Sequence, residues 1–154
     1  MTIEKKKTLI LNDYERGFLT ALIDGEGAIG IRSQGKNRNA MPIVSIANTS
    51  KPLLDYVHTL IEDTSVCSFR QSVDKRNPKW KKMYYLNIKG SRNVQPILEE
   101  IKDGLIVKKQ QAKLALSVCK SVNSRKHNNI KERGLTIRDM ETVECVLKLN
   151  KKGV

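Results

Sequence analysis

The order of helical and strand-like apolar patterns constrains the fold of this chain more than any other feature of its sequence. Asn12 and Glu15 form a capping-box pair that opens a first helix, which Gly25 and Gly27 are expected to end near Ile23. The apolar face of this helix consists of Tyr14, Phe18, Ala21 and Leu22. Two strands are predicted next, at 28–34 and 41–47, with the Gly/Asn/Lys-rich segment 35–40 as their hairpin.

The same succession of elements continues along the chain. A second helix is predicted after Thr49 or Ser50, with Pro52 in its first turn, and two more strands at 66–73 and 81–88. A third helix contains Pro96, which is acceptable near a helix start, and a fourth follows Gly104. After a polar, basic loop, a last helix is expected over about 136–150. This order predicts an α+β fold: a single αββαββα domain whose saddle-like antiparallel sheet is covered by helices on one face, plus C-terminal helices.

Composition is that of one globular domain over residues 1–154. The chain is 39% hydrophobic, which is enough to bury a core at this length, and no apolar stretch approaches the ~20 residues of a membrane-spanning helix. The charged N-terminus lacks a secretory apolar region. We therefore expect an intracellular protein, in the cytoplasm, nucleoid or an organelle, without a membrane partner. The cysteines are odd in number and widely spaced, so we expect buried free thiols and no zinc site.

The positive charge predicts a polyanionic partner. The chain has 29 Lys and Arg against 16 Asp and Glu, a net charge of +13, and the cations are spread along the sequence. A dispersed surplus on a folded domain favours a surface that follows a phosphate backbone, although a general solubility surface is the alternative.

The predicted open face of the sheet is the place for that partner. Alternation places Gly30, Met41 and Ile43 on it together with largely polar and basic side chains, and a twisted two-hairpin sheet fits the major groove of double-stranded DNA. An ordinary solvated sheet face is the alternative interpretation. The DNA-contacting candidates on this face and its turns are Arg32, Gln34, Lys36, Arg38, Ser45, Ser68, Arg70, Ser72, Lys82 and Tyr85.

The segment 17–27 carries the most specific chemistry. Asp24 and Glu26, each followed by glycine, lie where the first helix ends and the first strand begins. Carboxylates are unfavourable at the carbonyl end of a helix dipole, and a divalent metal would offset this. Carboxylate and carbonyl oxygens suit Mg²⁺, whereas a solvated Asp-Gly turn is the alternative.

The longer pattern resembles the signature of the LAGLIDADG homing endonucleases. Thr20 and Ala21 stand where the motif usually has Ala and Gly, and the element order over about residues 12–122 is also similar to that of the family. No second copy of the motif occurs, so the chain resembles the single-motif members. The matching motif residues are Leu19, Leu22, Ile23, Asp24, Gly25, Glu26 and Gly27.

The resemblance implies a role for each motif residue. Glu26, the second acid, is the implied metal ligand, helped by the Gly25 carbonyl, and Asp24 is implied to be structural. The implied cofactor is Mg²⁺, with Mn²⁺ expected to be accepted. Single-motif members are homodimers whose motif helices pack together, so the implied dimer interface contains Gly17, Thr20, Ala21 and Asp24.

Three further residues resemble the solvent-organising shell of the family. Lys108 resembles its active-site lysine, Asn48 stands where a polar residue orients water, and Lys51 is a further candidate. A phosphate contact or a solvated charge is the alternative for either lysine.

The resemblance implies intron-homing DNA cleavage: a metal-dependent double-strand break at a long, roughly palindromic target, made by a homodimer. The alternative is a non-cleaving nucleic-acid-binding protein of the same fold, either an intron RNA maturase or a DNA-binding regulator. A basic ribosome-associated protein would explain the charge but not the Asp-Gly-Glu-Gly sequence.

Overall fold

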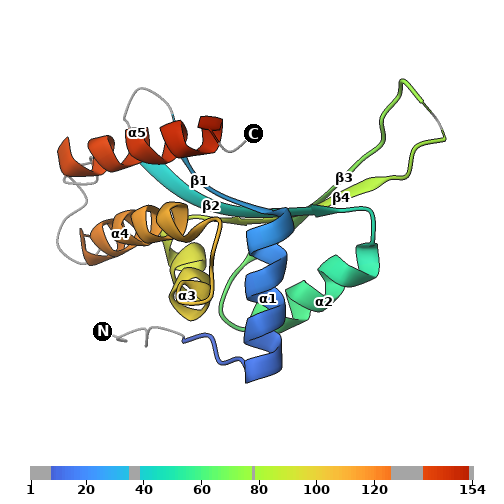
Figure 1. The fold of residues 1–154 in the computed structure, drawn as a ribbon, viewed down its shortest axis with the longest axis horizontal. Helices are drawn as coiled ribbons and strands as arrows, with labels where there is room; N and C mark the ends of the chain where they lie inside the picture. The colour runs from blue at the N-terminus through green and yellow to red at the C-terminus, as the bar shows by residue number, and fades with distance from the viewer. Residues whose placement is uncertain (1–7, 35–38, 78, 126–136, 153–154) are drawn as a thin grey trace.

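A computed structural model describes residues 8–34, 39–77, 79–125 and 137–152. Four strands form one sheet, and five helices surround it (Figure 1), which confirms the predicted α+β fold class. The elements are α1 (Asp13–Glu26), β1 (Gly27–Gln34), β2 (Asn39–Asn48), α2 (Lys51–Ile61), β3 (Cys67–Ser72), β4 (Met83–Lys89), α3 (Ser91–Ile101), α4 (Lys109–Arg125) and α5 (Ile137–Lys152).

The sheet is antiparallel throughout, with strand order β1-β2-β4-β3. Because side chains alternate along each strand, the register assigns one face to the core and the other to the surface. The core face is apolar and packs against the helices; its buried side chains are Ile29, Ile31, Val44, Ile46, Leu86 and Ile88. The opposite face contains Arg32, Met41, Ser45, Tyr85, Ser68, Arg70 and Ser72, as the alternation predicts.

Helix α1 begins as predicted but extends further. Asn12 and Glu15 form both hydrogen bonds of the capping box. The predicted end near Ile23 is wrong, because the helix continues through Gly25 to Glu26 and the Gly27 N–H still donates to the carbonyls of Leu22 and Ile23. The two acids of the motif therefore belong to the last turn of the helix.

Helix α5 changes the expected picture of an uncovered sheet face. It packs against both α4 and β1, and Figure 1 shows it on the opposite side of the strands from α1, α2 and α3. The Asn150 side chain donates to the Ile29 carbonyl and lies next to Gly30, whose side of the sheet was predicted to be open. The open face is thus limited to the part of the sheet beyond this contact.

Two smaller predictions are corrected by packing. Pro96 lies in the middle of α3, where it is buried, and not near the start of the helix. Of the cysteines, only Cys119 is buried, and burial raises the pKa of its thiol to about 12. Cys145 is exposed on α5, and Cys67 is half-buried in β3.

Candidate active site

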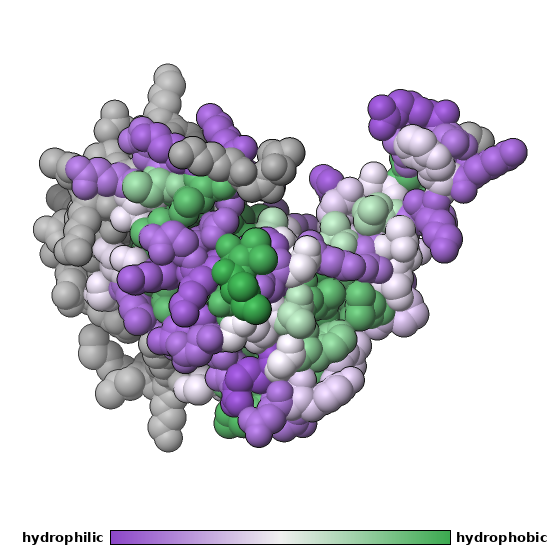
Figure 2. All heavy atoms as spheres, viewed as in Figure 1, coloured by the Kyte–Doolittle hydropathy of each residue, from purple (hydrophilic) through white to green (hydrophobic). Residues whose placement is uncertain are grey.

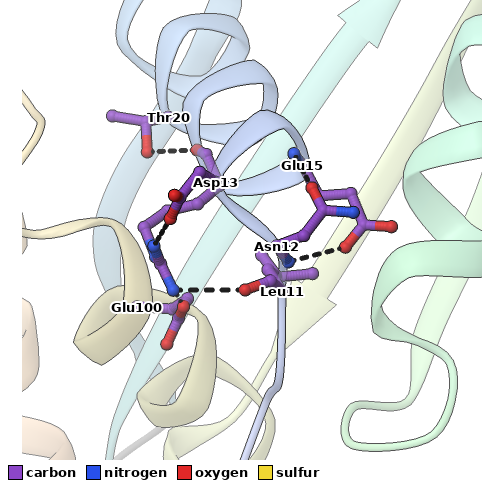
Figure 3. A network of polar contacts seen from close by, with 7 residues as sticks. Leu11, Asn12, Asp13, Glu15, Thr20 and Glu100 are labelled. Atoms are coloured by element: carbon purple, nitrogen blue, oxygen red, sulfur yellow. Dashed lines mark hydrogen bonds and ion pairs between the residues drawn. The ribbon is translucent and has the colours of Figure 1, made fainter.

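The first turn of α1 is fixed to α3 by Arg16, which sets the direction in which the helix points. Arg16 Nε donates to Glu100 Oε1 at 2.7 Å, and its other nitrogens donate to Asp13 Oδ1 and to the Leu11 carbonyl (Figure 3). The Thr20 hydroxyl donates to the Arg16 carbonyl one turn further on. These contacts hold the start of α1 in place. The sequence does not predict them, because Glu100 lies far from Arg16 along the chain.

The last turn of α1 is fixed by Asp24. Its carboxylate accepts hydrogen bonds from three consecutive backbone N–H groups, those of Ile106, Val107 and Lys108, at 2.9–3.1 Å. Burial opposes ionisation most strongly, but these N–H donors and the Lys108 charge together outweigh it, so the pKa of Asp24 is lowered. Asp24 thereby joins the end of α1 to the chain just before α4.

Lys108 turns back toward the same helix end. Its ammonium group donates to the Asp24 carbonyl oxygen, one of the outward carbonyls of the last turn of α1. A cation there also interacts favourably with the helix dipole. The predicted active-site lysine and the first motif acid are thus brought together by one set of contacts.

Glu26 is held separately from Asp24. The Asn48 amide Nδ2 donates to Glu26 Oε2 at 2.6 Å, and Asn48 Oδ1 accepts from the Ser50 N–H at 2.7 Å. Because Ser50 is the N-cap of α2, the side chain of Asn48 is oriented by the start of that helix. Glu26 is exposed, and only one of its two carboxylate oxygens accepts the bond from Asn48. It is therefore the acid that is available to a ligand.

Lys51 lies beside this site but is directed elsewhere. Its ammonium group pairs with Asp55 on the next turn of α2, at 2.8 Å, and both side chains are about half exposed. The contact is an ordinary i,i+4 surface pair. Its predicted catalytic role remains a prediction.

The described part of the chain contains no complete cluster of metal-binding side chains. Within residues 8–34, 39–77, 79–125 and 137–152, no group of three His, Cys, Asp or Glu residues is placed to hold an ion. The chemistry of Glu26 nevertheless fits a hard cation, because a free carboxylate beside helix-end carbonyls offers only oxygen ligands.

Six of the DNA-contacting candidates share the open face of the sheet: Arg32, Ser45, Ser68, Arg70, Ser72 and Tyr85. Arg32, Ser68 and Arg70 are exposed, and the Arg70 guanidinium stacks over the Tyr85 ring at 4.8 Å from its centroid. The Ser45 hydroxyl donates to Asn87 within the same face. Gln34 ends β1, Ser72 ends β3 and Lys82 immediately precedes β4. Lys36 and Arg38 lie outside the described residues.

The family model for a LAGLIDADG-like domain matches residues 13–102, from the start of α1 through α3. The chain belongs to the LAGLIDADG family. The match contains both motif acids and Asn48, and Lys108 lies just beyond it. No curated protein sequence matches the chain.

Solved LAGLIDADG structures share this fold. I-CvuI, solved with DNA in the presence of Mg, is 19% identical, with a TM-score of 0.59 over 90% of this chain and 98% of that one. I-CeuI, complexed with DNA, is 10% identical, with a TM-score of 0.64 over 91% of this chain and 69% of its own. I-SmaMI, bound to uncleaved DNA with calcium, is 20% identical, with a TM-score of 0.64 over 92% of this chain; the matched part is 46% of I-SmaMI.

Helix α1 has an exposed face, and apolar side chains lie on both sides of this face. A Cβ added at Gly17 or Gly25 would meet nothing within 4 Å, and Ala21 is exposed between them. Thr20, in contrast, is only 7% exposed, and its Cγ2 packs against Gly104, so little of it remains for a second chain.

The apolar neighbours of this helix face were missed in the sequence. Ile106 and Val107 are 84% and 72% exposed, and Figure 2 shows a hydrophobic patch among hydrophilic residues in the middle of the face that α1 occupies in Figure 1. On the α2 side, Phe18 stacks with Tyr14 and meets Tyr56 edge-on at 5.2 Å. Two adjacent apolar residues directly before the candidate Lys108 were the available signal.

No helix within the described part of the chain could span a membrane.

Proposed function

We propose that this protein is a homodimeric, divalent-metal-dependent DNA endonuclease that makes a double-strand break at a long, roughly palindromic site. The observation that carries the proposal is the separation of the two motif acids. Asp24 is saturated by three backbone N–H donors, whereas Glu26 is exposed and held in place by Asn48. A simple turn between α1 and β1 would not require the Glu26 carboxylate to be held in this orientation.

Glu26, with the Gly25 carbonyl, would hold the metal. When bound, a divalent ion such as Mg²⁺ can activate water and stabilise the charge that develops on the leaving oxygen. The hydrogen bond from Asn48 favours one orientation of the Glu26 carboxylate, which would lower the cost of ordering it when metal and DNA bind. Lys108 supplies a fixed positive charge at the same helix end, where an additional negative charge would develop on a phosphate under attack.

A second copy of the chain would complete the site. Each chain offers one free motif carboxylate, and cleavage of both DNA strands needs a reacting centre at each. Packing of two α1 helices through Gly17, Ala21 and Gly25 would bring the two Glu26 residues together, since small side chains allow close helix approach. A two-fold protein dimer implies a DNA target whose halves are related by the same symmetry.

The apolar neighbours of α1 support this assembly. If the two-fold axis runs along the paired helices, the Ile106 side of one chain faces the Tyr56 side of its partner, because a half-turn exchanges left and right. Both sides carry exposed apolar groups, and an apolar surface of this kind usually marks an interface. The same association would bury the surfaces on both sides of the motif helix.

The alternative is a non-cleaving binder of the same fold, acting on intron RNA or regulating DNA. A purely binding role leaves the arrangement of Glu26, Asn48 and Lys108 unexplained, although it does not conflict with the basic open face. Cleavage is therefore favoured. Intron-encoded origin and an intracellular site of action are part of the same proposal.

The test is a plasmid-nicking assay with the DNA that flanks the reading frame as insert, because homing enzymes recognise the site that their own element interrupts. Linear product is expected in Mg²⁺ or Mn²⁺ and none in EDTA. A scrambled insert is the control. Binding of the insert without any cut strand in either ion would favour the non-cleaving alternative.

A further inference from the structure

The hairpin between β3 and β4 extends beyond the sheet and ends in an aromatic group surrounded by cations. Paired residues end at Ser72 and Met83, and Figure 1 shows the connection projecting away from the helices. The described residues of the hairpin tip, 74–77 and 79–82, include Asp74 and five cationic residues. Figure 2 shows this projection as a largely hydrophilic lobe separate from the body of the molecule.

Trp80 is the unusual residue of the tip. It is the only tryptophan of the chain, and 53% of it is exposed. An indole projecting from a folded body, away from any core, gains little from folding, which is typical of a residue that is buried by a partner. Its backbone N–H donates to the Asn77 carbonyl, so a turn fixes its position.

Arg76 is arranged to support the indole and not to read a base. Its Nε and Nη2 donate to the two carboxylate oxygens of Asp74, at 2.6–3.2 Å, and its guanidinium lies 5.8 Å from the centroid of the Trp80 ring. A guanidinium whose paired N–H groups are occupied by a carboxylate cannot offer them to guanine. Arg70, which lies within β3, instead has its guanidinium over the Tyr85 ring.

We propose that the hairpin tip is a sequence-independent clamp on the DNA backbone, outside the base pairs that the sheet reads. Trp80 packs on deoxyribose or on an exposed base face, and the nearby lysines, Lys79, Lys81 and Lys82, neutralise phosphates. The inference rests on the proposed DNA-binding function. It adds that affinity and sequence preference belong to different parts of one hairpin: the tip supplies affinity, and the paired strands supply preference.

Tryptophan fluorescence tests this directly, because Trp80 is the sole indole. Several unrelated 5′-labelled duplexes of equal length are titrated without Mg²⁺, and DNA anisotropy and protein emission are followed together. Emission should change with the same midpoint as anisotropy for every duplex. Binding without an emission change would overturn the clamp and leave the proposed function intact, whereas no anisotropy change with any duplex would argue against the proposed function itself.

Variants separate a clamp from a base reader. Trp80→Ala should weaken every duplex by roughly the same factor, about tenfold, as expected for the loss of one aromatic contact. Trp80→Phe should retain most of the affinity, and Lys120→Ala, an exposed cation on α4, is the control that should change little. Unchanged affinity in Trp80→Ala, or a loss confined to some duplex sequences, would refute the proposal.

Discussion

At the scale of single residues, the two acids of the motif differ in what they contact, and this difference was only partly readable from the sequence. The resemblance implied a structural Asp24 and a metal-binding Glu26. The partners of Asp24, the N–H groups of residues 106–108, lie more than 80 residues away and follow no local pattern. The resemblance implies a role for Asn48 from its position before α2, but the bond of Asn48 to Glu26 depends on the pairing of β1 with β2.

Glu26→Gln separates binding from cleavage. The substitution keeps size and hydrogen bonding to Asn48 but removes the charge that would hold a divalent ion. Cleavage should fall to background while target binding persists or tightens, since a carboxylate beside phosphates is repulsive without metal. Nicking and anisotropy measure the two properties. Glu62→Gln, at the C-cap that follows α2, is the control, and a Glu26→Gln protein that still cuts at the wild-type rate in Mg²⁺ would disprove the assignment.

Asp24→Asn should act mainly on stability. The pKa of Asp24 is lowered in the folded protein, so ionisation stabilises the fold above the unfolded pKa, and this contribution is lost as the pH falls through the folded pKa. We expect the free energy of unfolding at neutral pH to fall by about 1–2 kcal/mol, as for loss of a helix cap. The variant should also lose less stability on acidification than the wild type.

Urea unfolding over a pH series checks this expectation. Asp55→Asn is a matched control, because it removes an acid from the exposed pair with Lys51 and should change stability little. A wild-type unfolding free energy for Asp24→Asn at neutral pH would contradict the role of Asp24 as a link between α1 and the start of α4.

At the scale of helices and strands, the sequence predicts features that depend on neighbouring residues but not those that depend on residues far apart along the chain. The capping box at Asn12 and the cap of α2 at Ser50 depend on neighbouring residues, so both were predicted. The sequence does not predict the end of α1, because glycine normally favours a helix end, whereas this helix continues through Gly25. Gly27 is required for another reason: a Cβ there would lie 2.8 Å from the Ile23 backbone, where β1 leaves the helix. The distant contact of Asp24 supports the extra turn.

The strands of the open face make a prediction of their own. The Arg70 guanidinium lies over the Tyr85 ring, an interaction that does not use its N–H groups, and Arg32 is exposed on β1. Alanine at either position should cost about 1–3 kcal/mol on a preferred base and less on others. Affinity measured against a library of single-base target variants checks this. A uniform loss over the library would mean that the residue contacts phosphate.

At the scale of the whole molecule, the proposed dimer makes a prediction about the helix face through which it would form. Gly17→Leu should leave the fold intact, since an added Cβ meets nothing within 4 Å, but it should separate the paired α1 helices and abolish dimer and cleavage together. Sedimentation and the nicking assay measure the two losses. Ser117→Leu, exposed on α4, is the control for a surface leucine. A dimeric Gly17→Leu protein with wild-type activity would exclude this helix face as the interface.

The position of α5 affects how readily the folded protein can aggregate through its sheet. β1 is a terminal strand of the sheet, and unpaired backbone groups along such a strand are a template for adding strands from other molecules. Asn150 occupies one outward carbonyl, that of Ile29, and Val146 anchors the helix in the core. Helix α5 therefore protects this side of the sheet against aggregation, while β3, at the other edge, is mostly exposed and carries Arg70 and polar side chains.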